Sequence, residues 1–341
     1  MTALEDRLIR YADLRPCRNA FIDTRSPGSE AKENFTLIGP GVSENPAQHV
    51  HIPEPHGFNI GAARQPGGCL NSQHSHRTAE VFIAHSGRWR FMWGPEGEDG
   101  SIELRAGDVI SLPTHMFRGF ENLGSRRSVD FLFGLLGGDD PGKVTWSPPV
   151  FDLAKRFGLV LLEGGRLIDT VKGETVPPGA KLQKPPNAAA MRKIVSPSAE
   201  QMAQCVVRLR DLKGNPASAL AGPGVEECAV IGTRASGDGF ARGPIAGWWA
   251  HGFTLRCLKM RTGAVVALHS RWEAEVVFVH TGTLEITTPS GVVMMGAGDT
   301  FTTPIGMPRG FRATSSDGCT AFITRGGDAP GPVVFSQPKA A

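Results

Sequence analysis

Two histidines and a glutamate stand in a pattern that suits metal binding: one residue separates His74 from His76, and Glu80 follows four residues later. On a β-strand, residues i and i+2 share a face, so both imidazoles point the same way. Glu80, after a tight turn, can aim at the same point. Two imidazoles and one carboxylate leave coordination positions open and suit Fe(II), Ni, Mn or Zn. The alternative is a histidine pair that packs in a core or lies on the surface.

The sequence contains two copies of this pattern. At an offset of 195 residues the second copy repeats His56-Gly57-Phe58, His74-Ser75, Ala79-Glu80-Val81 and Gly87. At an offset of 191 it repeats Gly107-Asp108, Pro113 and Arg118-Gly119-Phe120. One change of offset is what two copies of a domain with a single difference in loop length produce, so the chain is predicted to be a duplicated domain.

Each copy reads as β-structure. Short β-branched and aromatic runs at 80–85 and 275–280 end in turn residues, and residues 88–93 alternate with a period of two. Many short strands separated by turns favour a closed barrel or a two-sheet jelly roll. Helical patterns are confined to residues 2–14, 150–157 and 198–209. The fold class is therefore all-β.

The spacing of the motif is similar to that of a known family. Gly68, His74, His76, Glu80 and Gly87 match every position of the first cupin motif, Gly-x5-His-x-His-x3-Glu-x6-Gly. Gly107, Pro113 and Asn122 have the spacing of the second motif, and the second copy repeats both frames with Gly263, His269, Glu275, Gly282, Gly298, Pro304 and Gly306. The chain thus resembles a bicupin, with motif blocks of roughly 55 residues in each half.

The resemblance implies two tandem cupin (double-stranded β-helix) barrels with a few short flanking helices. The N-terminal cupin domain is expected at 1–150, with its motifs at 68–87 and 107–122. A linker with a short helix follows at 151–195. The C-terminal cupin domain is expected at 196–341, with motifs at 263–282 and 298–313. Because cupins often close their sheet edges across a partner, a homodimer is also expected.

The first copy departs from the family at the fourth metal ligand. Arg118 stands where the family has a histidine, and His115 stands where it has a turn glycine. A guanidinium cannot coordinate a metal. Arg118 either binds the carboxylate or enolate of a substrate or neutralises Glu80 as a structural partner. His115 is a candidate substitute ligand or proton shuttle, unless it is a solvated turn residue. Arg118 and His115 are therefore the catalytic candidates beside the metal ligands His74, His76 and Glu80.

The second copy keeps only part of the ligand set. His269 and Glu275 remain, while Arg271 and Arg309 replace the other two ligands. Two fixed positive charges beside one carboxylate predict a degenerate site in which a salt-bridge cluster stands in for a metal. An anion-binding site is the alternative.

The resemblance to cupin dioxygenases implies a metal-dependent oxygenase acting on a small acidic or phenolic substrate in the N-terminal barrel. It implies one divalent transition metal, with Fe(II) favoured and Ni, Mn or Zn as alternatives. Two other functions stay open: a non-redox cupin lyase, decarboxylase or isomerase, and a metal-free bicupin with a binding or structural role. Oxalate decarboxylase activity is disfavoured, because that family keeps complete ligand sets in both barrels.

Composition excludes several classes of protein. The chain has 341 residues, of which 40% are hydrophobic and 20% charged, so it is globular rather than disordered. Its net charge of +3 is too small to indicate a nucleic-acid or membrane partner. Six scattered cysteines without a Cys-x-x-Cys pair predict reduced thiols. The charged N-terminus does not read as a signal peptide. A soluble protein of the cytoplasm with a small anionic substrate is expected.

Overall fold

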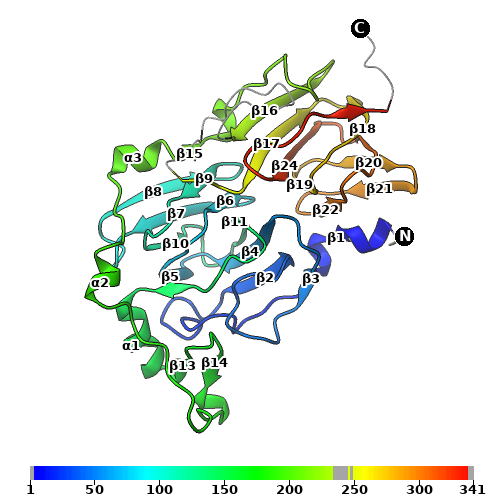
Figure 1. The fold of residues 1–341 in the computed structure, drawn as a ribbon. Coiled ribbons are helices and arrows are strands. Elements are labelled where there is room, and N and C mark those ends of the chain that lie inside the picture. The colour runs from blue at the N-terminus through cyan, green and yellow to red at the C-terminus, as the bar shows by residue number, and fades with distance from the viewer. Residues whose placement is uncertain (1–3, 233–244, 246–248, 337–341) are drawn as a thin grey trace. The chain divides into compact units, whose positions relative to one another are not determined.

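The computed structural model describes residues 4–232, 245 and 249–336 (Figure 1). The chain divides into two compact units. The N-terminal barrel unit contains Arg15–Pro53 and Asn59–Val206. The C-terminal barrel unit contains the residues up to Leu14, the short segment Glu54–Phe58, and the residues from Val207 onward. Residues up to Leu14 were assigned to the first domain from sequence, and their contacts group them with the second. The limits of the linker stay a prediction.

The N-terminal barrel is built from two sheets (Figure 1). The larger has the strand order β15-β9-β6-β11-β4-β2-β3, where the strands are β2 (Glu33–Ile38), β3 (Val50–Ile52), β4 (Phe58–Pro66), β6 (Glu80–Ala84), β9 (Val109–Leu112), β11 (Val129–Gly137) and β15 (Val206–Val207). The smaller has the order β12-β5-β10-β7-β8, with β5 (Leu70–Ser75), β7 (Arg88–Trp93), β8 (Gly100–Arg105), β10 (Arg118–Asn122) and β12 (Thr145–Trp146).

The C-terminal barrel repeats this arrangement. Its larger sheet has the order β1-β22-β19-β24-β17-β16, with β1 (Leu8–Ile9), β16 (Val225–Ile231), β17 (Phe253–Met260), β19 (Glu275–Thr281), β22 (Thr300–Thr303) and β24 (Cys319–Gly326). Its smaller sheet has the order β21-β20-β23-β18-β25, with β18 (Val265–Ser270), β20 (Leu284–Thr288), β21 (Gly291–Met295), β23 (Arg309–Ala313) and β25 (Val334–Phe335). Two double-sheet jelly rolls in tandem confirm the predicted fold class.

Each barrel buries the apolar face of its alternating strands. In β7, Trp89, Phe91 and Trp93 are buried, whereas Arg88 on the same strand is exposed. The C-terminal barrel has a comparable core that includes Leu258, Val277, Ile286, Phe301 and Phe311. This alternate burial matches the period of two in the sequence, which is why the strand at residues 88–93 could be predicted from its residue pattern.

The helices are short and lie between the barrels in sequence. They are α1 (Pro148–Arg156), α2 (Ala188–Met191) and α3 (Ala199–Ala203), with a small hairpin of β13 (Leu159–Leu161) and β14 (Leu167–Asp169) after α1. Ser198 and Gln201 form the capping box expected at the start of α3. The helix expected over 2–14 is wrong for the residues described. That stretch instead contains two 3₁₀ turns, at Leu4–Arg7 and Tyr11–Asp13, on either side of β1.

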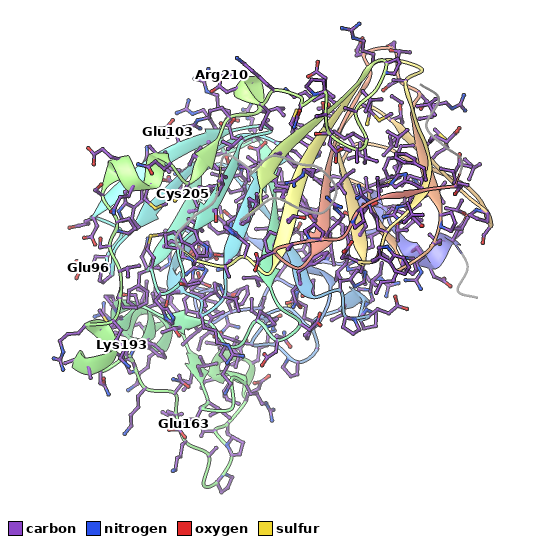
Figure 2. All side chains as sticks on the ribbon, turned by 45° about the horizontal axis from the view of Figure 1, so that its top comes forward. Glu96, Glu103, Glu163, Lys193, Cys205 and Arg210 are labelled. Carbon is purple, nitrogen blue, oxygen red and sulfur yellow. The ribbon has the colours of Figure 1, made fainter. Side chains whose placement is uncertain are left out.

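The surface carries both signs of charge. Glu96, Glu103, Glu163, Lys193 and Arg210 are all exposed, on loops, strand β8 and a 3₁₀ turn (Figure 2). All six cysteines are buried and none forms a disulfide, Cys205 among them (Figure 2). No helix among the described residues is both long and apolar enough to cross a membrane.

Candidate metal centre

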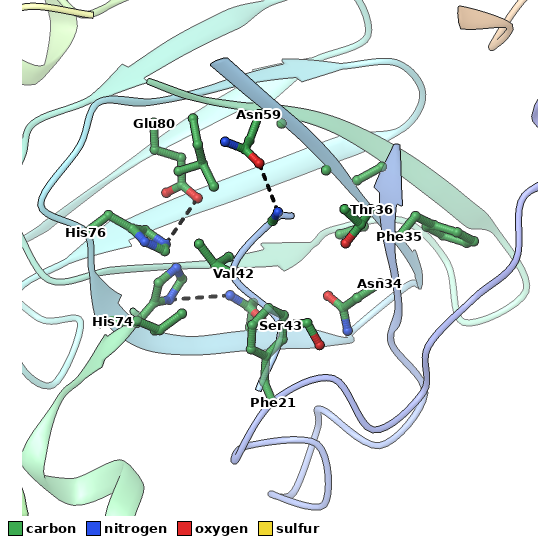
Figure 3. Close-up of a pocket in the computed structure, with 18 of the residues that line it drawn as sticks. Phe21, Asn34, Phe35, Thr36, Val42, Ser43, Asn59, His74, His76 and Glu80 are labelled. Atoms are coloured by element: carbon green, nitrogen blue, oxygen red, sulfur yellow. Dashed lines mark hydrogen bonds and ion pairs between the residues drawn. The ribbon is translucent and has the colours of Figure 1, made fainter. Parts of the chain in front are cut away.

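His74, His76 and Glu80 meet at one end of a pocket in the N-terminal barrel (Figure 3). His74 is on β5, His76 follows this strand, and Glu80 begins β6 in the other sheet. Each residue offers one ligand atom, and these atoms all lie within 4.8 Å of one another. All three side chains are buried, with 2–6% of their surface exposed. Among the described residues, no second group of three such side chains is found.

Hydrogen bonds fix how His74 presents its nitrogens. Its Nδ1 lies 2.8 Å from the Ser72 carbonyl oxygen, a bond in which the imidazole N–H donates. Nε2 then carries the lone pair and is the atom available to a metal. The Trp146 ring packs against the imidazole, with 5.4 Å between centroids. Burial, with the nearby Arg118 charge, lowers the pKa of His74 to about 3, so the imidazole is neutral as a ligand must be.

A buried ion pair stands behind this histidine. Lys32 and Asp23 are paired and fully buried, and Lys32 Nζ also donates to Asn71 Oδ1 at 2.9 Å. Asp23 Oδ2 accepts from the Ser72 backbone N–H at 3.0 Å. The carboxylate therefore holds the backbone of Ser72, whose carbonyl orients His74. The sequence analysis did not identify Asp23 or Lys32, since a loop brings them to the site and no motif marks them.

His76 and Glu80 face each other, and Arg118 contacts Glu80 from the far side. His76 Nε2 lies 3.5 Å from Glu80 Oε1. Arg118 Nε and one terminal guanidinium nitrogen each lie 2.9 Å from Glu80 Oε2. Burial and the Arg118 charge keep the pKa of His76 well below its usual range. Burial raises the pKa of Glu80, while Arg118 opposes that rise. One carboxylate oxygen is thus engaged by the guanidinium, and the other faces the imidazole.

The donor set fits a divalent transition ion. Two neutral imidazoles and a carboxylate are a usual ligand set for such ions, and all three side chains are buried. Arg118 adds a further NH1 bond to the Met116 carbonyl, at 2.9 Å, so its guanidinium is held in place. His74, His76 and Glu80 would hold the ion, and Arg118 would keep a fixed positive charge beside it.

His115 is not part of this cluster. Its side chain is exposed, and its backbone has the left-handed φ of +59° that the family's turn glycine adopts readily. The His115 N–H donates to the His76 carbonyl at 3.0 Å, and the His115 carbonyl accepts from the Val195 N–H at 3.0 Å. The turn thereby braces the segment that carries His76. A catalytic role for the imidazole stays a prediction.

The corresponding position of the C-terminal barrel is occupied by charged residues. Arg309 Nε lies 3.0 Å from Glu275 Oε1, and His269 Nδ1 bonds to the Ala267 carbonyl at 2.9 Å, as Arg118 and His74 do in the first barrel. Arg271 replaces the second histidine and is buried. Burial raises the pKa of Glu275, but Arg309 and its neighbours lower it to about 2 overall. This geometry fits the salt-bridge cluster expected there.

The pocket in the N-terminal barrel extends well beyond the three ligands. Its volume is about 700 Å³, including its open mouth. Its walls are largely apolar, with Phe21, Val42, Phe82, Phe120, Leu136 and Trp146 among the lining residues. These wall residues come from β6, β10, β11, β12 and two loops, which are distant in sequence, so no local motif marks them as a group.

Comparisons with known proteins bear on the fold. No family model matches this sequence, and no curated protein matches it. Among solved structures, the chain is similar to the Lactobacillus farciminis oxalate decarboxylase formate complex, with 11% identity and a TM-score of 0.59 over 98% of this chain and 89% of that one. It is also similar to Bacillus subtilis oxalate decarboxylase at pH 4.6, with 11% identity and a TM-score of 0.58 over 98% of this chain and 79% of that one. These likenesses, together with the two repeated barrels, show that the chain has the fold of a bicupin.

Proposed function

We propose that the protein is a metal-dependent cupin enzyme that acts on a small organic acid in its N-terminal barrel without net redox change, as a lyase, decarboxylase or isomerase. The observation that carries this proposal is the buried group His74, His76 and Glu80 with Arg118 fixed on Glu80. The fold-level likeness to oxalate decarboxylases supports this reaction class as an analogy only.

The residues of the pocket suit an anionic substrate. A divalent ion held by the three ligands supplies a Lewis acid and open coordination positions. Arg118 offsets the single Glu80 carboxylate, so a loaded site retains the full charge of the ion and favours an anion. The largely apolar walls lower the local dielectric, which strengthens the electrostatic contact between the pocket and a carboxylate or enolate. His74 is held in the tautomer that leaves Nε2 free.

An oxygenase is the second candidate. The observation that favours it is the ligand set itself, because two histidines and one carboxylate with open positions are typical of non-haem iron oxygenases. The metal, with Fe(II) favoured and Ni, Mn or Zn as alternatives, belongs to this proposal in either case. A homodimer also stays a proposal, and light scattering that gives a monomer mass at micromolar concentration would contradict it.

Elemental analysis followed by anaerobic assay tests the function. We expect about one equivalent of a transition metal per chain in the wild type, none in His74→Ala, and an unchanged content in the matched variant His269→Ala. Turnover of a panel of keto and dicarboxylic acids should then proceed at the same rate with and without oxygen. Oxygen consumption matched to product would favour the oxygenase instead, and wild-type protein that takes up no metal would refute both enzymes.

A further inference from the structure

Apart from His76 Nδ1 at the metal centre, two polar atoms of the pocket have no hydrogen-bond partner among the described residues. They are Asn34 Nδ2, a donor, and Gln48 Oε1, an acceptor. Both residues line the pocket of the metal centre, and Asn34 is only 7% exposed. A buried polar group without a partner is destabilising, because it has lost its bonds to water and gained none in exchange. Such atoms in a pocket wall indicate that a ligand completes their hydrogen bonds.

Both atoms belong to one side of the pocket. Asn34 and Thr36 are two residues apart on β2 and share a face. Gln48 Nε2 donates to Thr36 Oγ1 at 2.6 Å, which leaves the Gln48 Oε1 end of the amide unpartnered. Figure 3 shows Asn34 and Thr36 on the side of the pocket away from His76 and Glu80.

The distance between this side and the metal ligands limits the length of the ligand. Strands β11 and β4 lie between β6, which carries Glu80, and β2, which carries Asn34. Three strand spacings correspond to roughly 14 Å between the backbones. Side chains reach inward from both, which leaves a span of about one six-membered ring with a short chain. Phe82 and Leu136 line the space between, so the middle of the ligand is apolar.

The same positions differ in the C-terminal barrel. In the N-terminal barrel Gly61 pairs with Thr36, and in the C-terminal barrel Arg256 pairs with Ala229. Both pairs lie next to a shift in strand register, so Arg256 occupies the position of Gly61. Glu80 pairs with Leu136, and its counterpart Glu275 pairs with Arg325, so Arg325 occupies the position of Leu136. By the same alignment of strands, Asn34 corresponds to Glu227. The neutral lining of the first pocket is therefore replaced by buried charged side chains in the second barrel. An uncharged polar contact is specific to the N-terminal pocket.

We infer that Asn34 and Gln48 recognise a second polar group of the substrate, a hydroxyl that accepts from Asn34 Nδ2 and donates to Gln48 Oε1. The substrate is then an organic acid with an apolar body of ring size and a hydroxyl at the end opposite to its carboxylate. The inference rests on the proposed function, because the carboxylate is placed at His74, His76 and Glu80. Asn34 and Gln48 are specificity-determining residues that take no part in bond making.

A pair of ligands that differ by one hydroxyl tests this inference. Calorimetric titration of the metal-loaded protein with 3-phenylpropionate and 3-(4-hydroxyphenyl)propionate measures the ratio of their affinities. We expect the hydroxylated acid to bind about tenfold more tightly to the wild type, as one hydrogen bond to a desolvated partner provides. The ratio should fall to near one in Asn34→Leu and in Gln48→Met. The matched control Gln204→Met changes an exposed glutamine and should keep the wild-type ratio.

The outcomes separate this inference from the proposed function. Equal affinity of the two acids for the wild type would overturn the inference and leave the metal enzyme standing. Failure of both acids to bind metal-loaded protein would overturn the inference as well. A wild type that takes up no metal and binds neither acid would overturn both. Should Asn34→Leu fail to fold, the half-buried Gln48 still decides the matter, because Gln48→Met removes only the amide.

Discussion

At the scale of single residues, the pairing of Arg118 with Glu80 favours the structural one of the two roles considered for the guanidinium. Arg118 is fully buried, and all of its described charge pairing is with Glu80. The same pair recurs in the other barrel between Arg309 and Glu275, where one of the histidine ligands is replaced. A pair that is kept where the ligand set is lost is what a structural role predicts, and this prediction can be tested by removing the guanidinium.

Removing this guanidinium should therefore destabilise the protein. Arg118→Met leaves the Glu80 carboxylate buried without its partner, which typically costs about 3–5 kcal/mol. Urea unfolding of metal-free protein measures the loss in free energy of unfolding. Arg309→Met is the matched variant and should cost a similar amount. A loss below about 1 kcal/mol in Arg118→Met would show that the pair contributes little, and would return Arg118 to the role of substrate anchor.

Asp23 offers a second test at this scale. Because its carboxylate holds the backbone N–H of Ser72, the residue whose carbonyl orients His74, Asp23→Asn should weaken metal binding by about 10–100-fold, the usual effect of an outer-sphere partner. Competition with a coloured chelator measures the affinity. Asp169→Asn, which disturbs the Asp169 pair with Arg25 away from the pocket, should leave the affinity unchanged. Equal metal affinity in wild type and Asp23→Asn would show that His74 needs no such support.

The residues that the sequence analysis could identify are those whose geometry is local. His74, His76 and Glu80 are close in sequence, so strand periodicity and one turn suffice to bring them together. Arg118 was placed by its position in a spaced motif. Asn34, Gln48 and Lys32 were missed, because no spacing relates them to the histidines and tertiary packing alone brings them to the pocket. Comparison of the two copies strand by strand would have singled out Asn34 against Glu227.

Among the elements, β1 is a case in which pairing with another strand overrides a local preference for helix. The pattern of residues 2–14 favours a helix, yet Leu8 and Ile9 pair with Phe301 and Thr300 on β22. Arg10 and Tyr11 add contacts to the Asp299 carboxylate at 2.8 and 2.9 Å. A short helix is marginal without tertiary support, so the strand that completes a sheet edge is preferred. The capping box of α3, by contrast, depends on neighbouring residues and was predicted correctly.

The contribution of β1 can be measured directly. Ile9 is 5% exposed, so Ile9→Ala should cost about 2–4 kcal/mol through lost burial. Hydrogen exchange should quicken at Thr300–Thr303, whose edge β1 covers, while the exposed control Glu5→Ala should leave exchange there unchanged. Unaltered protection of β22 in Ile9→Ala would show that the edge does not depend on this strand.

For the whole molecule, buried ionisable groups predict how stability changes with pH. Burial lowers the pKa of His251, His269 and His280 to about 4, and that of His74 to about 3. Burial raises the pKa of Glu44 to about 8 and of Glu227 to about 7. Below about pH 6.5 these histidines are neutral in the folded protein but take up protons when the protein unfolds. The two carboxyls are protonated in the folded protein and release their protons when it unfolds.

Stability of the metal-free protein should therefore be greatest near pH 6.5. Below that value the histidines take up more protons on unfolding than the carboxyls release. The free energy of unfolding should therefore fall by about 3 kcal/mol for each pH unit by which the pH is lowered around pH 5.5. Between pH 6.5 and 8 it should also fall, less steeply, as Glu227 and Glu44 lose their protons in the folded state. Urea unfolding at pH 5.5, 6.5 and 8 checks both slopes. Stability that rises steadily from pH 6.5 to 8 would contradict the assignment of the two carboxyls.

The pairing of β1 with β22 has a consequence for how the protein is made. Leu8 and Ile9 leave the ribosome before their partners Phe301 and Thr300, which are translated roughly 290 residues later, a delay of about 15–60 s at usual rates of synthesis. During that interval the N-terminal barrel can fold, since nearly all of its strands have emerged, while the first strand waits unpaired. The C-terminal barrel is thus closed by a strand that is translated before the whole N-terminal barrel, so a growing chain exposes an open sheet edge, which chaperones can recognise, until both strands have emerged.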